Sequence, residues 1–263
     1  MGNKAGWGSI DRTFNIHIEN KSKKEKNYYV NVINGYINGV KVDFLCEGYA
    51  VGPGASGDAP LRFRDLDLDY VIGEATDIQF DVFVLGGDDA MKMIKYHMRK
   101  IDSIDGYSDE DSQIKTVNYY PMGEEKASKH KFDEEEYPQS KVIFDKEGVK
   151  VTLLEYEITD KNSIEAYMFV ENNTDYKINY RVSKCTVDGK EVVAGVNNLS
   201  NGDSIDKGMS NYWKVDVYNY NMESAGVTNI NDINFEISIS KLDTLFNIKT
   251  GETEMMKETA KID

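Results

Sequence analysis

Apolar and polar residues alternate along several short stretches of the chain. In residues 13–18, 77–84 and 234–239, Ile, Phe or Val occupies every second position. This period of two predicts β-strands with one buried face. No stretch has a clear helical period; residues 88–94 come nearest, and residues 92–100 fit a strand about as well.

The same order of motifs occurs twice along the chain. Residues 16–20 (IHIEN), 28–32 (YYVNV), 37–40 (INGV) and 76–81 (TDIQFD) are followed later by 168–172 (MFVEN), 178–182 (INYRV), 187–190 (VDGK) and 231–236 (NDINFE). Glu171 lies 152 positions after Glu19, and Asp232 lies 155 positions after Asp77. This spacing indicates a duplicated domain, because solenoid repeats run to roughly 20–50 residues.

Each copy contains the same predicted hairpin, marked by Asn38-Gly39 in the first and Asp188-Gly189 in the second. Both pairs suit a two-residue turn that needs positive φ. Short strands and turns at intervals of roughly 8–12 residues are typical of antiparallel immunoglobulin-like sandwiches. We therefore predict an all-β protein of two tandem immunoglobulin-like β-sandwiches, one over residues 1–101 and one over residues 141–250.

The two predicted copies differ at their beginnings. Residues 142–154 read as the first strand of the second copy, whereas the residues before Phe14 are polar and rich in Gly. We therefore expect the first strand of the first copy to be missing from this chain or supplied from elsewhere, and an open edge of this kind can exchange or accept a strand. Residues 102–140 have the composition of an acidic linker, with a possible extra strand over 114–120, and residues 251–263 form a polar tail.

Charge restricts the class of partner. Lys and Arg number 31 against 46 Asp and Glu, which gives a net charge of −15. Such a chain is repelled by nucleic acid and by anionic lipid, so we expect neither as a partner. There is no apolar run long enough to span a bilayer. Residues 1–6 lack the apolar core of a signal peptide, and Gly6 stands where a myristoylation motif has Ser or Thr.

One glycine motif matches a nucleotide-binding pattern. Residues 52–57 read GPGASG, which fits G-x-G-x-x-G, but Pro60 and the strand-like Leu61-Arg62-Phe63 follow where that pattern requires a helix. We interpret the motif as a loop between strands. Together with residues 195–209 of the second copy, residues 50–60 form the predicted contact loops, because binding residues concentrate on loops held by a rigid scaffold.

Other candidate groups have a structural interpretation beside a functional one. Three aspartates alternate along one predicted strand face, a second acidic group lies in the linker, three histidines are far apart, and four aromatic residues could form a platform for a sugar or peptide. These are Asp65, Asp67 and Asp69; Asp105, Asp109, Glu110 and Asp111; His17, His97 and His130; and Tyr212, Trp213, Tyr218 and Tyr220. None has the spacing of a calcium loop, a zinc motif or a nucleophilic triad, so we favour solvated and core positions.

Cys46 and Cys185 are the only cysteines, and they do not occupy equivalent positions in the two copies. We therefore expect free, buried thiols rather than a disulfide framework. Asn172-Asn173-Thr174 matches an N-glycosylation acceptor at a strand end.

The second copy resembles repeats of uncharacterised cell-surface and lipoprotein-type proteins of Gram-positive anaerobic bacteria. The resemblance rests on residues 142–151, 170–173, 182–183, 187–189 and 230–235. It covers nearly all of residues 141–250 and, less the first strand, residues 7–101. It implies an immunoglobulin-like sandwich and an extracellular or cell-surface location, and it transfers no functional residue.

We therefore predict a non-catalytic structural or interaction module with no catalytic, cofactor-binding or metal site, acting on an unknown protein or glycan partner. The alternative is a carbohydrate- or divalent-cation-binding protein. A hydrolase comes third and requires two carboxylates that face each other across a pocket.

Overall fold

The structure is a computed structural model that describes residues 12–22, 26–42, 44–46, 48–63, 73–87, 90, 112–159, 162–197, 204–245 and 248–262. Regular structure in these residues is nearly all β-strand, so the predicted all-β class is confirmed. The chain divides into two compact units. The first comprises residues 1–38 and 42–128, and the second comprises residues 39–41 and 129–263.

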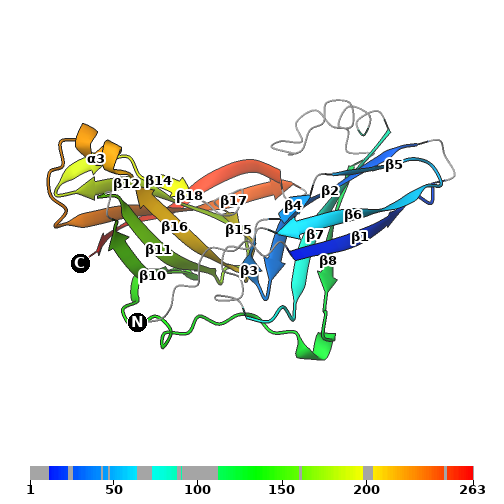
Figure 1. Cartoon of the computed structure of the whole chain (residues 1–263), viewed down its shortest axis with the longest axis horizontal. Coiled ribbons are helices and arrows are strands. Elements are labelled where there is room, and N and C mark those ends of the chain that lie inside the picture. The colour runs from blue at the N-terminus through cyan, green and yellow to red at the C-terminus, as the bar shows by residue number, and fades with distance from the viewer. Residues whose placement is uncertain are drawn as a thin grey trace. The chain divides into compact units, whose positions relative to one another are not determined.

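The first unit contains two antiparallel sheets (Figure 1). Its strands are β1 (Arg12–Glu19), β2 (Tyr28–Ile37), β4 (Phe44–Cys46), β5 (Tyr49–Val51), β6 (Ser56–Phe63), β7 (Ile78–Gly86) and β8 (Ser112–Tyr119), with the 3-10 helix η1 (Glu124–Lys126) after them. One sheet has the order β1-β6-β4. The other has the order β8-β7-β2, and β5 also pairs with β2.

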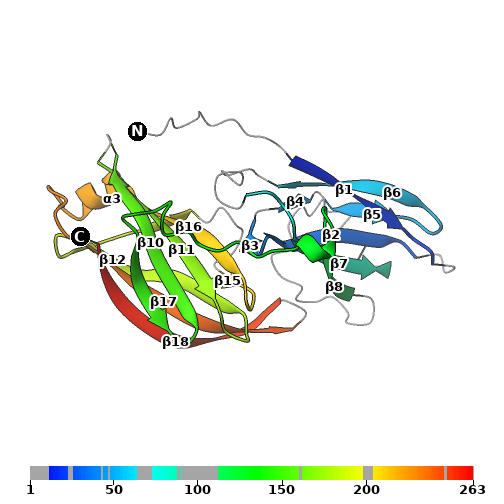
Figure 2. The same ribbon diagram turned by 90° about the horizontal axis from the view of Figure 1, so that it is seen from below.

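The second unit also has two sheets, which Figures 1 and 2 show as separate layers. Its strands are β9 (Lys141–Lys146), β10 (Val149–Ile158), β11 (Ile164–Asn172), β12 (Ile178–Val187), β13 (Lys190–Val192), β14 (Gly195–Asn197), β15 (Ser204–Ile205), β16 (Ser210–Val217), β17 (Ile233–Leu245) and β18 (Ile248–Ile262). Strand β16 leads into helix α3 (Asn219–Ser224), and β3 (Val40–Lys41) pairs in parallel with Ser210.

Strand pairing in the first unit recurs in the second. The pairs β1–β6, β6–β4, β2–β5, β2–β7 and β7–β8 correspond to β11–β16, β16–β14, β12–β15, β12–β17 and β17–β18. Even the irregularities match, because β2 shifts register between Val32 and Asn34 and β12 shifts between Val182 and Lys184. These five strand pairs therefore have the same order in both units.

A buried asparagine fixes the same turn in both units. The Nδ2 atom of Asn20 donates to the carbonyl oxygens of Lys26 at 2.9 Å and Val51 at 3.3 Å. Asn172 does the same at Tyr176 (2.9 Å) and Ile205 (3.1 Å). Buried polar groups in proteins are nearly always hydrogen-bonded, and here the amide and the carbonyl groups satisfy one another. The sequence motif E-N at both strand ends thus has a structural cause.

The core of the second unit lies between its two sheets. Strands β10, β11 and β16 contribute Val151, Met168 and Trp213, and the facing sheet contributes Tyr180 and Phe235, all 2% exposed or less. The rings of Tyr180 and Trp213 meet edge to face with centroids 5.0 Å apart. These side chains gather between the sheets because every second side chain of a strand points to the same face.

The structure corrects two predicted boundaries. Residues 142–154 are not one strand but the hairpin β9–β10, which turns at Glu147 and Gly148 with φ of 49° and 84°. Residues 251–263 are not a polar tail, because residues up to Ile262 belong to β18, which pairs with β17 throughout. Ala260 and Ile262 are buried, but few other apolar residues mark this strand in the sequence.

The described part of the predicted acidic linker, residues 102–140, is divided between the two units. Residues 102–111 lie outside the described part of the chain. Residues 112–119 form β8, which pairs with β7 of the first unit and includes most of the possible strand over 114–120. Residues 129–140 belong to the second unit.

Candidate binding surfaces

Strand β1 ends one sheet of the first unit. It pairs with β6 from Arg12 to Glu19, and no described residue pairs with its other edge. In the second unit the equivalent strand is β11, and its corresponding edge is covered by β10. Among the described residues, the first unit therefore has no strand at the position that β10 occupies in the second unit. We call the edge of β1 (Arg12–Glu19) that faces away from β6 the seat.

The open seat leaves apolar side chains incompletely buried. Phe14, Ile16 and Ile18 point to one face of β1 and are only half-buried. Their counterparts in β11 are Ala166, Met168 and Val170, each 0% exposed. The difference arises because β10 lays apolar side chains beside β11, whereas no described strand does so beside β1.

The outer faces of the two equivalent sheets have different chemistry. On β1, His17 forms an exposed pair with Asp58 on β6, with Nδ1 and Oδ1 2.7 Å apart. The equivalent pair in the second unit is Phe169 and Tyr212, whose ring centroids are 4.6 Å apart. The outer face at β1 is therefore polar, and the outer face at β11 is aromatic.

A segment of the predicted linker packs on that aromatic face. Phe132 stacks between Tyr137 and Phe169, with centroids 5.6 and 5.5 Å away. The Nε2 atom of His130 lies 2.9 Å from the hydroxyl of Tyr212. Burial lowers the pKa of His130, and the carboxylate of Glu136 opposes this shift. We call residues 129–140 the strap; their aromatic residues gave no sequence signal of packing because they lie among many charges.

A charged group lies further along the same face. Lys214 on β16 is 2.7 Å from Oε2 of Glu165 and 3.2 Å from Oδ1 of Asp216. Burial would lower the pKa of Lys214, but its hydrogen bonds to both carboxylates outweigh that effect and raise it. Burial and the hydrogen bond to Glu165 raise the pKa of Tyr167 to about 12. Lys214 offsets one of the two carboxylate charges, and its ion pair with Glu165 links β16 to β11, so we assign these side chains a structural role.

The predicted aromatic platform is divided by the fold. Trp213 is 2% exposed in the core, and its neighbour Tyr212 points to the opposite face under the strap. Only Tyr218 and Tyr220 remain together, with parallel rings (9°) and centroids 5.5 Å apart. Tyr220 is 62% exposed, so this pair is the part of the platform that a ligand could reach.

Of the two predicted contact loops, the first is largely strand, and the second contains two short strands. Residues 52–55 form the turn between β5 and β6, and the rest of residues 50–60 lies in those two strands. This turn agrees with the interpretation of GPGASG as a loop between strands, because a strand and not a helix comes after it. Gly54 adopts φ of 67°, as does the equivalent Gly208. In residues 195–209, β14 and β15 flank residues 198–203, which lie outside the described part of the chain.

The remaining candidates form no centre in the described part of the chain. Both acidic groups, Asp65, Asp67 and Asp69 and Asp105, Asp109, Glu110 and Asp111, lie outside it, and so does His97. Among described residues, no group of three His, Cys, Asp or Glu could hold a metal ion. Likewise, none of the described helices is long and apolar enough to cross a membrane.

Cys185 is a free thiol and is 2% exposed in the core of the second unit. Burial raises its pKa to about 12. The prediction of a free, buried thiol is therefore confirmed for this residue. Cys46 lies in β4, and the surroundings of its side chain are outside the described structure.

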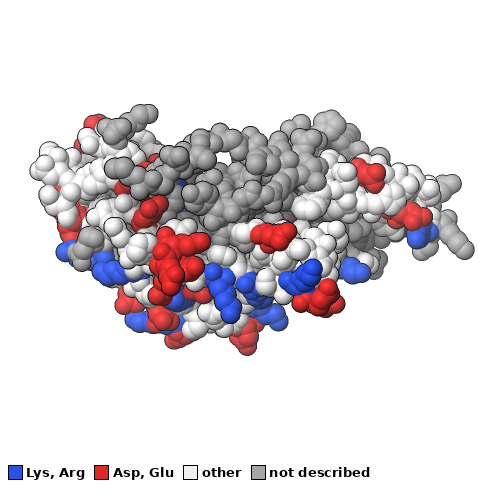
Figure 3. Space-filling view, turned by 60° about the horizontal axis from the view of Figure 1, so that its bottom comes forward, with Lys and Arg blue, Asp and Glu red and all other residues white. Residues whose placement is uncertain are grey.

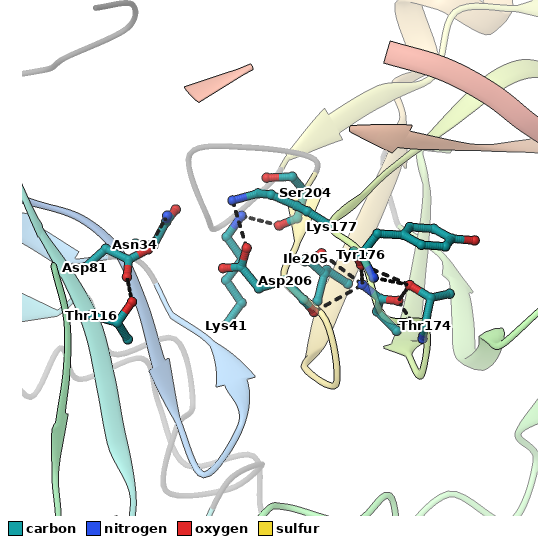
Figure 4. A network of polar contacts seen from close by, with 11 residues as sticks. Asn34, Lys41, Asp81, Thr116, Thr174, Tyr176, Lys177, Ser204, Ile205 and Asp206 are labelled. Carbon is teal, nitrogen blue, oxygen red and sulfur yellow. Dashed lines mark hydrogen bonds and ion pairs between the residues drawn. The ribbon is translucent and has the colours of Figure 1, made fainter. Parts of the chain in front are cut away.

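Polar networks within each unit serve the fold. In the first unit, Asp81 is 4% exposed and accepts hydrogen bonds from Thr116 at 2.6 Å and Asn34 at 2.9 Å (Figure 4). In the second unit, Lys177 pairs with Asp206 at 3.1 Å, close to the turn held by Asn172. Figure 3 shows acidic and basic side chains interspersed on the face it displays, as expected for a solvated surface.

Comparison with known proteins gives distant similarity in fold only. No protein family matches the chain, and no curated protein does. The GAE domain of yeast GGA1 aligns with 12% identity over 48% of this chain and 99% of its own, with a TM-score of 0.31. The YadV chaperone aligns with 13% identity over 92% of each chain (TM-score 0.23). The E. coli chaperone DraB aligns with 9% identity over 95% of this chain and 89% of its own (TM-score 0.25).

Proposed function

We propose that this chain is a non-catalytic interaction module of the cell surface, built from two tandem immunoglobulin-like sandwiches, whose first unit binds an extended segment of a partner beside β1. The observation that carries the proposal is the contrast between Ile16 and Ile18, which are half-buried, and Met168 and Val170, which are fully buried at equivalent positions. Adding a strand to a sheet edge gives main-chain hydrogen bonds for affinity and side-chain pockets for specificity.

The extracellular location follows from the resemblance to bacterial surface repeats and is part of the same proposal. The resemblance leaves the ligand open. The sheet edge supports binding rather than chemistry because it supplies backbone donors, backbone acceptors and apolar side chains. An edge of this kind is avoided or protected in natural proteins unless a partner uses it.

The test is selection of peptides from a random library on the whole chain. Enriched peptides are then measured against wild type, Ile18→Lys and His17→Lys. Lys at position 18 places a charge on the apolar side of the seat and disfavours strand addition. Lys at position 17 adds a charge on the outer face and can keep the pair with Asp58. Circular dichroism verifies that both variants fold.

We expect enriched peptides to lose at least about tenfold in affinity on Ile18→Lys, which corresponds to 1.4 kcal/mol. Their affinity for His17→Lys stays within about threefold of wild type, because an exposed ion pair contributes little. Peptides that bind all three proteins equally, or a library without enrichment, would contradict the proposal.

A second candidate function is carbohydrate binding at Tyr218 and Tyr220. The observation in its favour is the parallel stack of these rings with Tyr220 62% exposed, since an exposed aromatic face offers a large contact area to a sugar ring. A glycan array with wild type and Tyr220→Ala tests it. Binding that Tyr220→Ala abolishes and Ile18→Lys leaves unchanged would favour this candidate over the sheet edge.

A further inference from the structure

The pairing of β10 with β11 provides a template for the sequence of a strand that could bind beside β1. This inference rests on the proposed function and gives the chemistry of the bound segment. In the second unit, Val149, Val151 and Leu153 lie opposite Asn172, Val170 and Met168 in an antiparallel register. Val149 and Val151 are 0% exposed and Leu153 is 6% exposed. Three alternate apolar residues therefore complete this edge of the sandwich.

The register transfers to the first unit through several independent correspondences. Asn20 and Asn172 make the same hydrogen bonds. Glu19 pairs with Ser56 as Glu171 pairs with Ser210. The backbone N–H of Gly54 donates to Asn20 O at 3.1 Å, as Gly208 donates to Asn172 O at 2.7 Å. Each residue of β1 thus has one defined equivalent in β11.

We infer that the seat beside β1 accepts an antiparallel strand with apolar side chains opposite Asn20, Ile18 and Ile16, and a basic residue opposite Glu19. This is the pattern Val-Lys-Val-Thr-Leu of residues 149–153. A shift of the bound strand by one residue would turn every apolar side chain to the other face. Binding beside β1 therefore depends on the order of the residues as well as on their composition.

The basic residue of the pattern is inferred from the acidic residue that it faces. Lys150 lies opposite Glu171, with its Nζ atom 3.8 Å from Oε2. Glu19 holds the equivalent position on β1 and pairs with Lys21 at 3.1 Å, with both side chains at least half exposed. A partner's basic residue opposite Glu19 adds selectivity and little affinity, because exposed ion pairs are weak.

The probe is a synthetic peptide of residues 148–155, labelled at its N-terminus and titrated against the whole chain by fluorescence anisotropy. The control is a shuffled peptide of the same composition in which the polar residues take the apolar positions. Because the chain carries a net charge of −15, the control must keep the same charge. Hydrogen exchange with and without peptide locates the bound segment.

We expect saturable binding, slower exchange of β1 amides, and at least about tenfold weaker binding of the shuffled peptide and of the peptide carrying V151D. The peptide carrying K150E binds about two- to fivefold more weakly. Equal binding of native and shuffled peptides, or protection at β11 rather than β1, would overturn the inference.

The two proposals fail in different ways. If library peptides bind at β1 and are lost on Ile18→Lys, but the peptide of residues 148–155 does not bind there, the assigned pattern is wrong and the proposed function stands. If neither kind of peptide protects β1, both are wrong.

Discussion

Leu153 lies opposite Met168 where β10 pairs with β11, and both side chains are buried. Ile16 occupies the position of Met168 in the first unit and is half-buried. The same fold position is therefore a closed core site in one unit and an open edge site in the other. This contrast is the physical basis of the binding surface that we propose.

The first prediction compares these two positions directly. Met168→Ala lowers the free energy of unfolding of the second unit by about 2–5 kcal/mol, because it removes a fully buried side chain and leaves a cavity. Ile16→Ala costs the first unit less than about 2 kcal/mol, because part of the side chain already meets solvent. Urea unfolding followed by hydrogen exchange in each unit measures both values. Equal losses would contradict the view of β1 as an open edge.

The second prediction concerns the buried asparagine of the turn. Asn172→Ala removes the donor shared by the carbonyl groups of Tyr176, Ile205 and Asp206. We expect a loss of about 2–4 kcal/mol, because the buried carbonyl groups of Ile205 and Asp206 lose this donor. Fluorescence of Trp213 in a Trp7→Phe background follows the unfolding. The neighbouring exposed Asn173→Ala is the matched control and changes stability by less than about 0.5 kcal/mol.

The third prediction concerns the thiol of Cys185. Burial raises its pKa to about 12, so at pH 8 only about one thiol in ten thousand is ionised. Iodoacetamide therefore modifies Cys185 at least about a hundredfold more slowly in the folded protein than in guanidinium chloride. Mass spectrometry of the peptide that contains Cys185 measures the rate. Comparable rates in both conditions would place the thiol at the surface.

The fourth prediction concerns the strap and pH. Burial lowers the pKa of His130 in the folded protein below its ordinary value of 6.5. Between these two pKa values the unfolded state binds more protons, so the stabilising contribution of the neutral imidazole is present above about pH 6.5 and declines as pH falls. We expect amide exchange in residues 129–140 to accelerate at about pH 5.5 relative to pH 7.5, after correction for intrinsic exchange.

The control for this prediction is His130→Gln, which keeps a polar group near Tyr212 and does not titrate. In this variant the corrected exchange rates of the strap depend less on pH. The groups that face His130 include Tyr212, Phe169 and Glu136. A strap that responds equally to pH in wild type and variant would assign the effect to Glu136 or to another carboxylate.

Much of the fold follows from local patterns. The alternation predicts half-buried strands, and the repeated Asn38-Gly39 and Asp188-Gly189 pairs mark equivalent hairpin turns, with φ of 50° and 77° at the first pair. Asn38 accepts hydrogen bonds from two backbone N–H groups just before β7, and Asp188 accepts two from the residues just before β17. These motifs recur because the turn requires both positive φ and a side-chain acceptor.

Two other segments could not be predicted from a local pattern in the sequence. Strand β18 is mostly polar outside Ile248, Met255, Met256, Ala260 and Ile262, yet it is paired with β17 along its length. The partner sheet stabilises it, and its exposed face can be polar throughout. The aromatic strap is similar, because Phe132 and Tyr137 stand among charged residues and find their partners only across the sheet.

The sequence by itself determined the all-β class and the positions of the turns at Asn38-Gly39 and Asp188-Gly189, because these depend on side-chain period and on turn chemistry within a few residues. Only the tertiary structure decided that Ile16 and Ile18 remain half-buried, that Trp213 and Tyr212 point to opposite faces, and that residues 129–140 cover a sheet. Burial depends on what the neighbouring strand supplies, and that strand can lie far away in the chain or outside it.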